Sequence, residues 1–158
     1  LRAFPLLNAS LDDAAGEIVL KKHYDIGVAT ATDEGLTVPV IKGAERLSLF
    51  DLARAIERLA AGARERRLAL DEVSGGTFTV TSTGAYGGLL ATPIVHHPQV
   101  AILGVHAIGP RPVVRDGQVV AREMTNLSLS LDHRVVDGDV GAKFLYDVIA
   151  RLEHPEAP

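Results

Sequence analysis

A histidine and two carboxylates lie within one short segment of this 158-residue chain, DHRVVDG at residues 132–138. His133 carries a side chain that can accept and return a proton near neutral pH, as general acid–base catalysis requires. Asp137 follows four residues later, and Gly138 comes directly after it. A histidine beside aspartates in a turn is also common as a hydrogen-bonded structural link. The segment by itself therefore leaves both interpretations open.

The residues on either side predict a strand and a helix that would hold this histidine. Leucines at 127, 129 and 131 alternate with polar residues, which is the period of a strand that buries one face. Beyond the turn, apolar residues recur at helical spacing from Val140 to Leu152, and Asp139 stands where it could cap that helix. We interpret Asp132 as a carboxylate of the turn, and we expect His133 at the junction of two rigid elements.

A second group of candidates lies upstream, where TFTVTST at 77–83 predicts a strand with threonines on one face. Thr81 and Ser82 both carry hydroxyl groups, but they fall on opposite faces, so we expect at most one of them to point into a site. The GAYGG segment that follows, at 84–88, lacks the GxxxxGK[ST] and GxGxxG patterns. The sequence therefore predicts no nucleotide-binding loop there.

The rest of the chain predicts more strands than helices. Hairpins are expected around Asp- and Gly-rich turns. The predicted strands span 8–11, 17–24, 26–32, 36–41, 100–105, 113–115 and 118–123. A helix begins after Ser48, which with Asp51 resembles a capping box, and is expected to run to about Arg67. This pattern favours an α/β (α+β) two-layer sandwich.

Composition excludes several classes of protein. Hydrophobic residues make up 47% of the chain, enough for one domain with a substantial core. A net charge of -4 and an aromatic content of 4% argue against a nucleic-acid-binding surface. The absence of cysteine excludes disulfides, thiolate metal sites and a cysteine nucleophile. The apolar stretches are too short for a transmembrane helix, and we expect a cytoplasmic protein.

Two further clusters suggest binding sites only weakly. Arg64, Arg66 and Arg67 could contact phosphates, but we interpret them as a solvated helix end whose charges complement the helix dipole. His96 and His97 are adjacent on an extended segment, so their side chains point in opposite directions and cannot easily chelate one ion. We predict no metal site.

Four blocks of the chain, in order, resemble the catalytic domain of the dihydrolipoamide acyltransferase component of 2-oxo acid dehydrogenase complexes. They are FPLLNASLDD at 4–13, DIGVATATDEGLTVPVI at 25–41, GGTFTVTSTGAYGGLLATPIVHHPQVAILGVHAI at 75–108 and RPVVRDGQVVAREMTNLSLSLDHRVVDG at 111–138. The last block contains the HxxxDG signature of acyltransferases that use coenzyme A. The resemblance covers essentially the whole chain.

This resemblance implies a chloramphenicol-acetyltransferase-like fold, a mixed sheet with helices packed on one face. It implies transfer of an acyl group from a dihydrolipoyl thioester to coenzyme A, with His133 as the base and Thr81 as the donor to the oxyanion. Asp137 completes the catalytic set, with a role in holding the turn, and Ser82 and Gly138 are expected at the substrate. We expect Gly138 to provide a conformation or close approach that a side chain would block.

The resemblance also implies a homotrimer within a cubic or icosahedral core, with the histidine of one subunit facing the hydroxyl group of the next. Residues 1–158 would be an N-terminally truncated acyltransferase domain, with the lipoyl and peripheral-subunit-binding domains outside it. The partners would be the decarboxylase and dihydrolipoyl dehydrogenase components. A catalytically silent scaffold core and a free-standing coenzyme A-dependent acetyltransferase remain as alternatives, and acetyl, succinyl and branched-chain acyl groups are all compatible.

Overall fold

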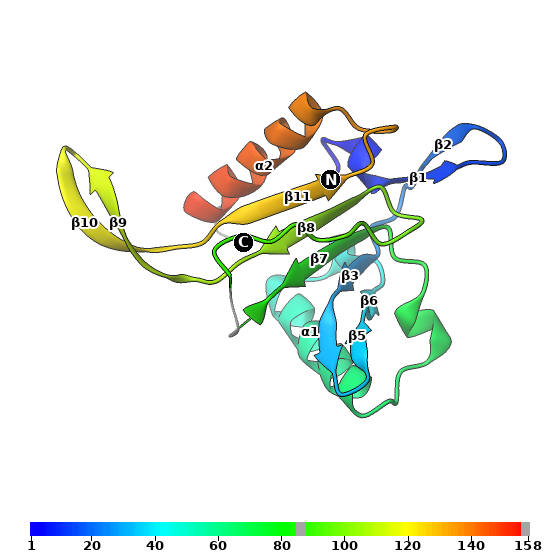
Figure 1. Cartoon of the computed structure of the whole chain (residues 1–158). Helices are drawn as coiled ribbons and strands as arrows, with labels where there is room; N and C mark the ends of the chain where they lie inside the picture. Colours follow the sequence, from blue (N-terminus) through cyan, green and yellow to red (C-terminus); the bar gives the residue numbers. More distant parts are fainter. Residues whose placement is uncertain (85–87, 156–158) are drawn as a thin grey trace.

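The computed structural model describes residues 1–84 and 88–155. Its centre is a five-stranded sheet (Figure 1). Across the sheet, the strands are β11 (Leu127–Leu131), β8 (Ala101–Val105), β7 (Phe78–Ser82), β3 (Ile26–Val28) and β6 (Val40–Ile41). β7 runs parallel to both of its neighbours, whereas β11 and β6 pair antiparallel at the two edges. The sheet is therefore mixed, as the resemblance implied.

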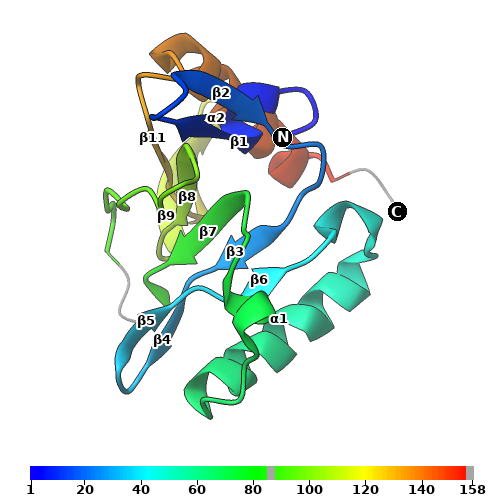
Figure 2. The ribbon, with the colours of Figure 1, turned by 90° about the vertical axis from the view of Figure 1, so that its right-hand side faces the viewer.

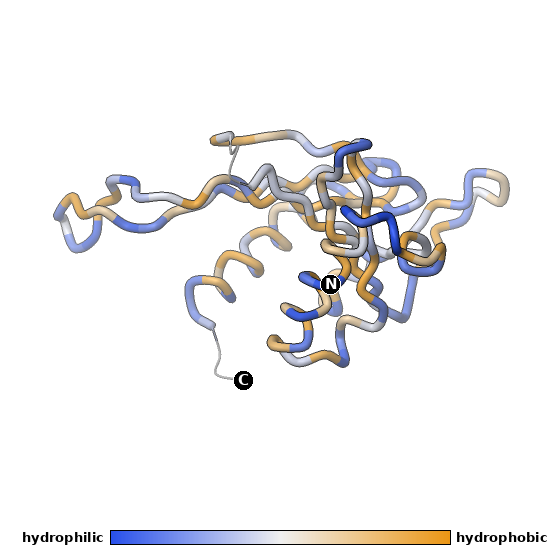
Figure 3. Tube along the Cα trace, turned by 90° about the horizontal axis from the view of Figure 1, so that it is seen from below, coloured by the Kyte–Doolittle hydropathy of each residue, from blue (hydrophilic) through white to orange (hydrophobic). Residues whose placement is uncertain are grey.

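In the part of the chain that the structure describes, three two-stranded hairpins accompany this sheet. They are β1 (Ala9–Asp12) with β2 (Glu17–Leu20), β4 (Thr30–Thr32) with β5 (Gly35–Thr37), and β9 (Gly109–Arg115) with β10 (Gln118–Met124). The β9–β10 hairpin extends far from one end of the sheet, and its hydropathy changes repeatedly along its length (Figure 3). Asp116 and Gly117 at its tip have φ of 51° and 75°, which matches the paired left-handed residues of a tight hairpin turn.

The two long helices lie on the same side of the sheet (Figure 2). α1 (Leu49–Arg64) contacts β4 and β6, and α2 (Gly138–Glu153) contacts β11. Short 3-10 helices complete the elements: η1 (Pro5–Asn8), η2 (Ala44–Arg46) and η3 (Leu70–Val73). The predicted α+β architecture with helices on one face is confirmed.

The ends of α1 follow from its sequence. Ser48 Oγ accepts a hydrogen bond of 3.1 Å from the Asp51 backbone N–H, so the predicted N-cap is confirmed. At the other end, the backbone N–H groups of Arg66 and Arg67 bond to the carbonyls of Ala63 and Gly62. These two bonds form a Schellman motif, with Arg66 in the left-handed region at φ 56°. The helix therefore ends at Arg64, before the predicted Arg67.

Two predicted strands are each divided in two by the structure. The run at 26–32 becomes β3 and β4, and the run at 36–41 becomes β5 and β6. Between them, Val28 N–H donates to the Pro39 carbonyl and Ala29 N–H donates to Val80. Pro39 has no backbone N–H that could donate to the neighbouring strand, so a regular ladder of hydrogen bonds cannot continue past it. The prediction of two long strands was wrong for this reason, whereas the hairpin turn expected between the two runs is present between β4 and β5.

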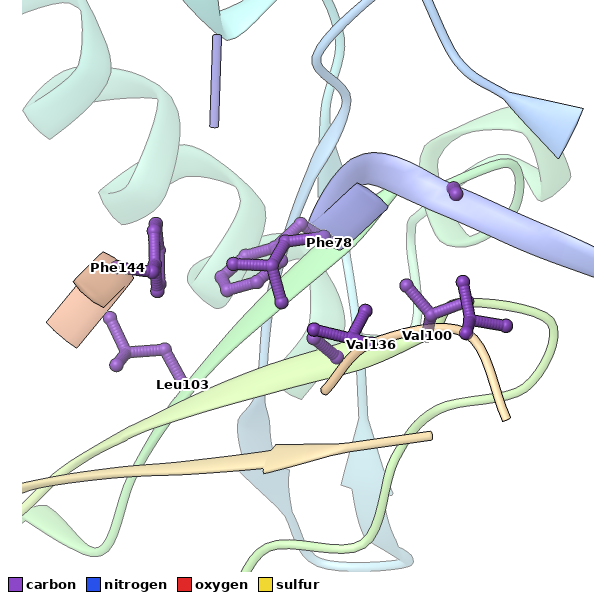
Figure 4. Close-up of a cluster of buried hydrophobic side chains, with 9 residues drawn as sticks. Phe78, Val100, Leu103, Val136 and Phe144 are labelled. Carbon is purple, nitrogen blue, oxygen red and sulfur yellow. The ribbon is translucent and has the colours of Figure 1, made fainter. Parts of the chain in front are cut away.

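A core of apolar side chains joins the sheet to α2 (Figure 4). The Phe144 ring of α2 meets the rings of Phe4 and Phe78 edge to face, with ring centroids 5.6 Å and 5.8 Å apart. Val136 is completely buried in the same cluster, and the leucines of β11 pack against it. This core therefore contains Val136, which follows His133 by three residues.

Within the described residues, no helix combines the length and the apolar character needed to cross a membrane.

Phe144→Ala is expected to destabilise the fold strongly, because it removes a buried ring that contacts two others. We expect a loss of about 3–5 kcal/mol in the free energy of unfolding, measured by urea titration. Phe50→Ala is the matched control, since Phe50 is exposed on α1 and should change the unfolding free energy by about 0.5 kcal/mol or less. Equal losses in the two variants would contradict the described core.

Candidate functional site

His133 lies in a tight turn whose hydrogen bonds converge on Asp132. The Asp132 backbone N–H donates to the Val100 carbonyl at 2.8 Å, which extends the pairing of β11 with β8 by one bond. The Asp132 carbonyl accepts from the N–H groups of Val135 and Val136, both at 3.0 Å. Its carboxylate accepts from the Arg134 N–H at 3.0 Å, which closes an Asx-turn around His133. The backbone of His133 is therefore held from both sides.

The same turn separates a buried side from an exposed side. Val135 and Val136 are buried in the core and anchor the turn from below. The side chain of His133 is 73% exposed and that of Asp137 is 81% exposed. The imidazole is thus exposed on a turn whose backbone is held in place, and this turn lies at the predicted junction of a strand and a helix.

Asp137 lies next to the imidazole and also begins the helix. Its Oδ1 is 3.7 Å from Nδ1 of His133, within ion-pair range if the histidine is protonated. Asp137 is the N-cap residue of α2, although its side chain makes no cap hydrogen bond. The prediction that Asp139 caps this helix was wrong: Asp139 lies in the first turn and its Oδ2 bonds Lys143 at 2.8 Å. That contact lowers the pKa of Asp139.

Gly138 opens α2 at a position with open space beside it. A Cβ added there would meet nothing within 4 Å among the described residues, and its φ lies outside the left-handed region. The described residues therefore neither block a side chain at this position nor require the conformational freedom of glycine.

Thr81 lies in β7 on a polar row that crosses the sheet. Thr81 pairs with Gly104 of β8, and Gly104 pairs with Ser128 of β11. The three residues share one face, since partners directly opposite in a sheet point the same way. A Cβ at Gly104 would lie 2.5 Å from Ser128 Oγ, so the glycine leaves the space between the two hydroxyl residues free of a side chain.

Ser82 points to the opposite face from Thr81, as predicted. Its Oγ accepts a 3.1 Å hydrogen bond from the Gly84 N–H, which ends the strand in a local turn. Among the described residues, no hydrogen bond involves the Thr81 hydroxyl. Residues 85–87 of the Gly-rich segment lie outside the described residues.

His106 belongs to this row and lies directly after the last residue of β8. It is buried, and its Nε2 lies 2.8 Å from Ser128 Oγ. Its Nδ1 has no hydrogen-bond partner among the described residues. The alternation of Ser128 with the core leucines of β11 was the signal that could have placed a polar partner here.

The structure does not bring Thr81 and His133 together within one chain. Thr81 pairs with Gly104 of β8. The last residue of β11, Leu131, pairs with Ala101, which lies three residues before Gly104 in β8. Thr81 and the end of β11 are therefore separated by about 10 Å along the strands and by two strand spacings of about 4.8 Å each across the sheet, and His133 lies two residues beyond that end. A reacting group cannot contact both residues of the same chain.

The other sequence candidates have ordinary structural roles. Arg66 forms an ion pair with Glu34 at 2.6 Å, and Arg67 bonds Glu65, which agrees with a solvated helix end. In residues 1–84 and 88–155, no group of three or more His, Cys, Asp or Glu side chains is arranged to hold a metal ion.

A family model and a relative of known description both match this chain, and their descriptions agree. The model of the family described as 2-oxoacid dehydrogenases acyltransferase (catalytic domain) matches residues 1–158. A dihydrolipoyllysine-residue acetyltransferase component of the pyruvate dehydrogenase complex of Staphylococcus aureus is 44% identical over 99% of this chain. The chain spans 36% of that relative's length.

Solved structures share the fold along nearly the whole chain. One is the dihydrolipoamide acetyltransferase of Azotobacter vinelandii, solved to study a serine, a histidine and an asparagine in its catalytic mechanism. It is 41% identical with a TM-score of 0.92, over 98% of this chain and 63% of that one. The cubic core of a pyruvate dehydrogenase multienzyme complex is 41% identical with a TM-score of 0.90, over 96% and 63%. A chloramphenicol acetyltransferase, 16% identical with a TM-score of 0.53 over 92% and 68%, shares the fold alone.

Gly138→Ala is expected to leave the fold intact, because an added methyl group meets open space at a helix start. We expect a free energy of unfolding that is unchanged or up to about 1 kcal/mol higher. Gly27→Ala is the contrasting variant, since its Cβ would lie 2.7 Å from Thr79 Oγ1 and Val38 Cγ1. A loss for Gly138→Ala as large as that for Gly27→Ala, measured by urea titration, would contradict the described geometry.

Proposed function

Because this chain belongs to the family of 2-oxoacid dehydrogenase acyltransferases, we propose that it transfers an acyl group from a dihydrolipoyl thioester to coenzyme A. The observation that carries this proposal is the exposed imidazole of His133 on a rigid turn, beside Asp137. Coenzyme A is a substrate in this reaction, and the lipoyl group arrives on a domain outside residues 1–158. The neutral thiol of coenzyme A is a poor nucleophile, so a base must take its proton.

His133 is the residue proposed for that base. A neutral imidazole with its proton on Nδ1, toward Asp137, leaves the lone pair on Nε2 to accept the thiol proton as sulfur attacks the thioester carbonyl. The tetrahedral intermediate then collapses, the carbon–sulfur bond to the lipoyl sulfur breaks, and the imidazolium returns the proton to that leaving sulfur. Asp137 stabilises the imidazolium and orients the ring.

Thr81 is the residue proposed to donate a hydrogen bond to the negative oxygen of the intermediate. In the Azotobacter vinelandii protein, the intervals between serine and histidine and between histidine and asparagine are the same as those separating Thr81, His133 and Asp137. Threonine keeps the hydroxyl group of serine. Aspartate and asparagine share a side-chain oxygen that accepts hydrogen bonds, so the common role is orientation of the ring rather than a required charge.

The separation of Thr81 from His133 within one chain supports a site shared between two copies. We propose that the chain forms a homotrimer in which the histidine of one copy faces the threonine of the next, within a larger core. The similarity to a cubic core supports this assembly and, with it, a scaffolding role that accompanies catalysis. The decarboxylase and dihydrolipoyl dehydrogenase components would be its partners, and a cytoplasmic location fits a chain without cysteine.

Acetyl is the acyl group that the comparisons favour. The Staphylococcus aureus relative is an acetyltransferase component of a pyruvate dehydrogenase complex, and the Azotobacter vinelandii protein is a dihydrolipoamide acetyltransferase. Comparing rates with acetyl-, succinyl- and isobutyryl-coenzyme A, in the reverse direction with dihydrolipoamide as acceptor, tests this choice.

His133→Ala in the assembled protein is expected to lower kcat for acetyl transfer by about 10²–10⁴-fold, because the general base is lost. The assay follows acetyl transfer from acetyl-coenzyme A to dihydrolipoamide. Circular dichroism and sedimentation of the variant check that the fold and the assembly are retained. A rate within about tenfold of the unmodified protein would remove His133 from this role.

Thr81→Val is expected to lower kcat by about 10²–10³-fold, because it keeps the shape of threonine and removes the hydroxyl group. Thr81→Ser keeps the hydroxyl group and should retain most of the activity in the same assay. If Thr81→Val stays active while Ser82→Ala does not, the oxyanion donor is Ser82.

A further inference from the structure

A line of charged side chains ties the turn that carries His133 to a hairpin far away in the sequence. The Arg134 guanidinium donates to both carboxylate oxygens of Asp132, with Nε–Oδ1 and Nη2–Oδ2 distances of 3.0 Å and 2.7 Å. Its remaining arm donates from Nη1 to Oδ1 of Asp13 at 2.8 Å. Asp13 lies in the turn of the β1–β2 hairpin, so one side chain bridges two segments 121 residues apart.

Both ends of this line are fixed independently. Asp132 is held by its backbone bond to Val100 and by the Asx-turn with Arg134. At the other end, Asp12 Oδ1 accepts the N–H groups of Ala14 and Ala15 at 3.0 Å, which closes the hairpin turn around Asp13. A guanidinium that binds one carboxylate through two donors also has a restricted orientation.

The hydrogen bonds from Arg134 lower the pKa of Asp132, which favours the ionised carboxylate that binds the guanidinium. Arg134 and Asp13 are 60% and 61% exposed, and ion pairs of this exposure contribute little to global stability. The effect of the contact is therefore local, on the segment between Asp132 and Arg134.

The residue between Asp132 and Arg134 is His133. We propose that Arg134 is a positioning residue which, through Asp132 and Asp13, fixes the orientation of the His133 imidazole toward Asp137 and toward the incoming thiol. The kinetic part of this inference rests on the proposed acyl transfer. Catalytic groups need placement within a fraction of an ångström, and a displacement of about 1 Å can cost about 10²-fold in rate.

The first test separates positioning from substrate binding and from folding. Arg134→Gln in the assembled protein should lower kcat by about 10- to 100-fold, with the KM for coenzyme A and the thermal midpoint unchanged. Arg134→Lys should recover part of the loss, and Asp13→Asn should cause a smaller loss of the same kind. Glu34→Gln is the matched control, because Glu34 and Arg66 form an ion pair of 63% and 66% exposure far from His133. A kcat within twofold of the unmodified protein for Arg134→Gln, or a loss expressed in KM, would overturn the proposal.

The second test does not depend on catalysis. Hydrogen–deuterium exchange, followed by mass spectrometry of the peptide that contains residues 132–137, reports the amides bonded to Asp132. Exchange should be faster in Arg134→Gln than in the unmodified protein and unchanged in Glu34→Gln. Unchanged exchange in Arg134→Gln would overturn the proposed positioning even if activity fell. Faster exchange together with an active His133→Ala variant would leave the turn contact standing and refute the proposed function instead.

Discussion

The reversal of the chain between β11 and α2 is the constraint on which the site depends. Asp132 accepts hydrogen bonds through its carbonyl from the N–H groups of Val135 and Val136, and through its carboxylate from that of Arg134. Val136 is completely buried, so the turn cannot lift away without opening the core. The exposed imidazole of His133 is therefore carried by a turn that is anchored in the core. The exposure of the imidazole and the rigidity of the backbone below it come from neighbouring residues of the same turn.

The pairing of the strands sets a second constraint, which concerns where the two halves of the site can meet. β7 is parallel to β8, and β11 is antiparallel to it, so Thr81 and the end of β11 lie at opposite ends of the sheet. No rotation of side chains can close that gap. If both residues act in one reaction, they must come from different molecules. The reaction then requires the assembled protein.

Much of this could be predicted from the sequence, because local patterns decide it. The alternation in β11, the Ser48 cap and the Asp–Gly turn of the β9–β10 hairpin each depend on neighbouring residues. Two errors were local: Pro39 lies inside the predicted run at 36–41 and cannot donate to a ladder, and Asp137 rather than Asp139 begins α2. Other features were missed because distant residues decide them. The surroundings of Gly138 and the contact from Arg134 to Asp13 depend on segments far apart in the sequence, so no local pattern contains them.

The most direct test of a shared site is to mix two inactive proteins. His133→Ala and Thr81→Val are unfolded together in equal amounts, refolded and assayed for acetyl transfer. In random assemblies, a histidine from one copy meets a threonine from the next at about a quarter of the contacts, so about a quarter of the unmodified activity should return. A mixture no more active than the two variants assembled separately would contradict a site formed by His133 and Thr81 of neighbouring copies.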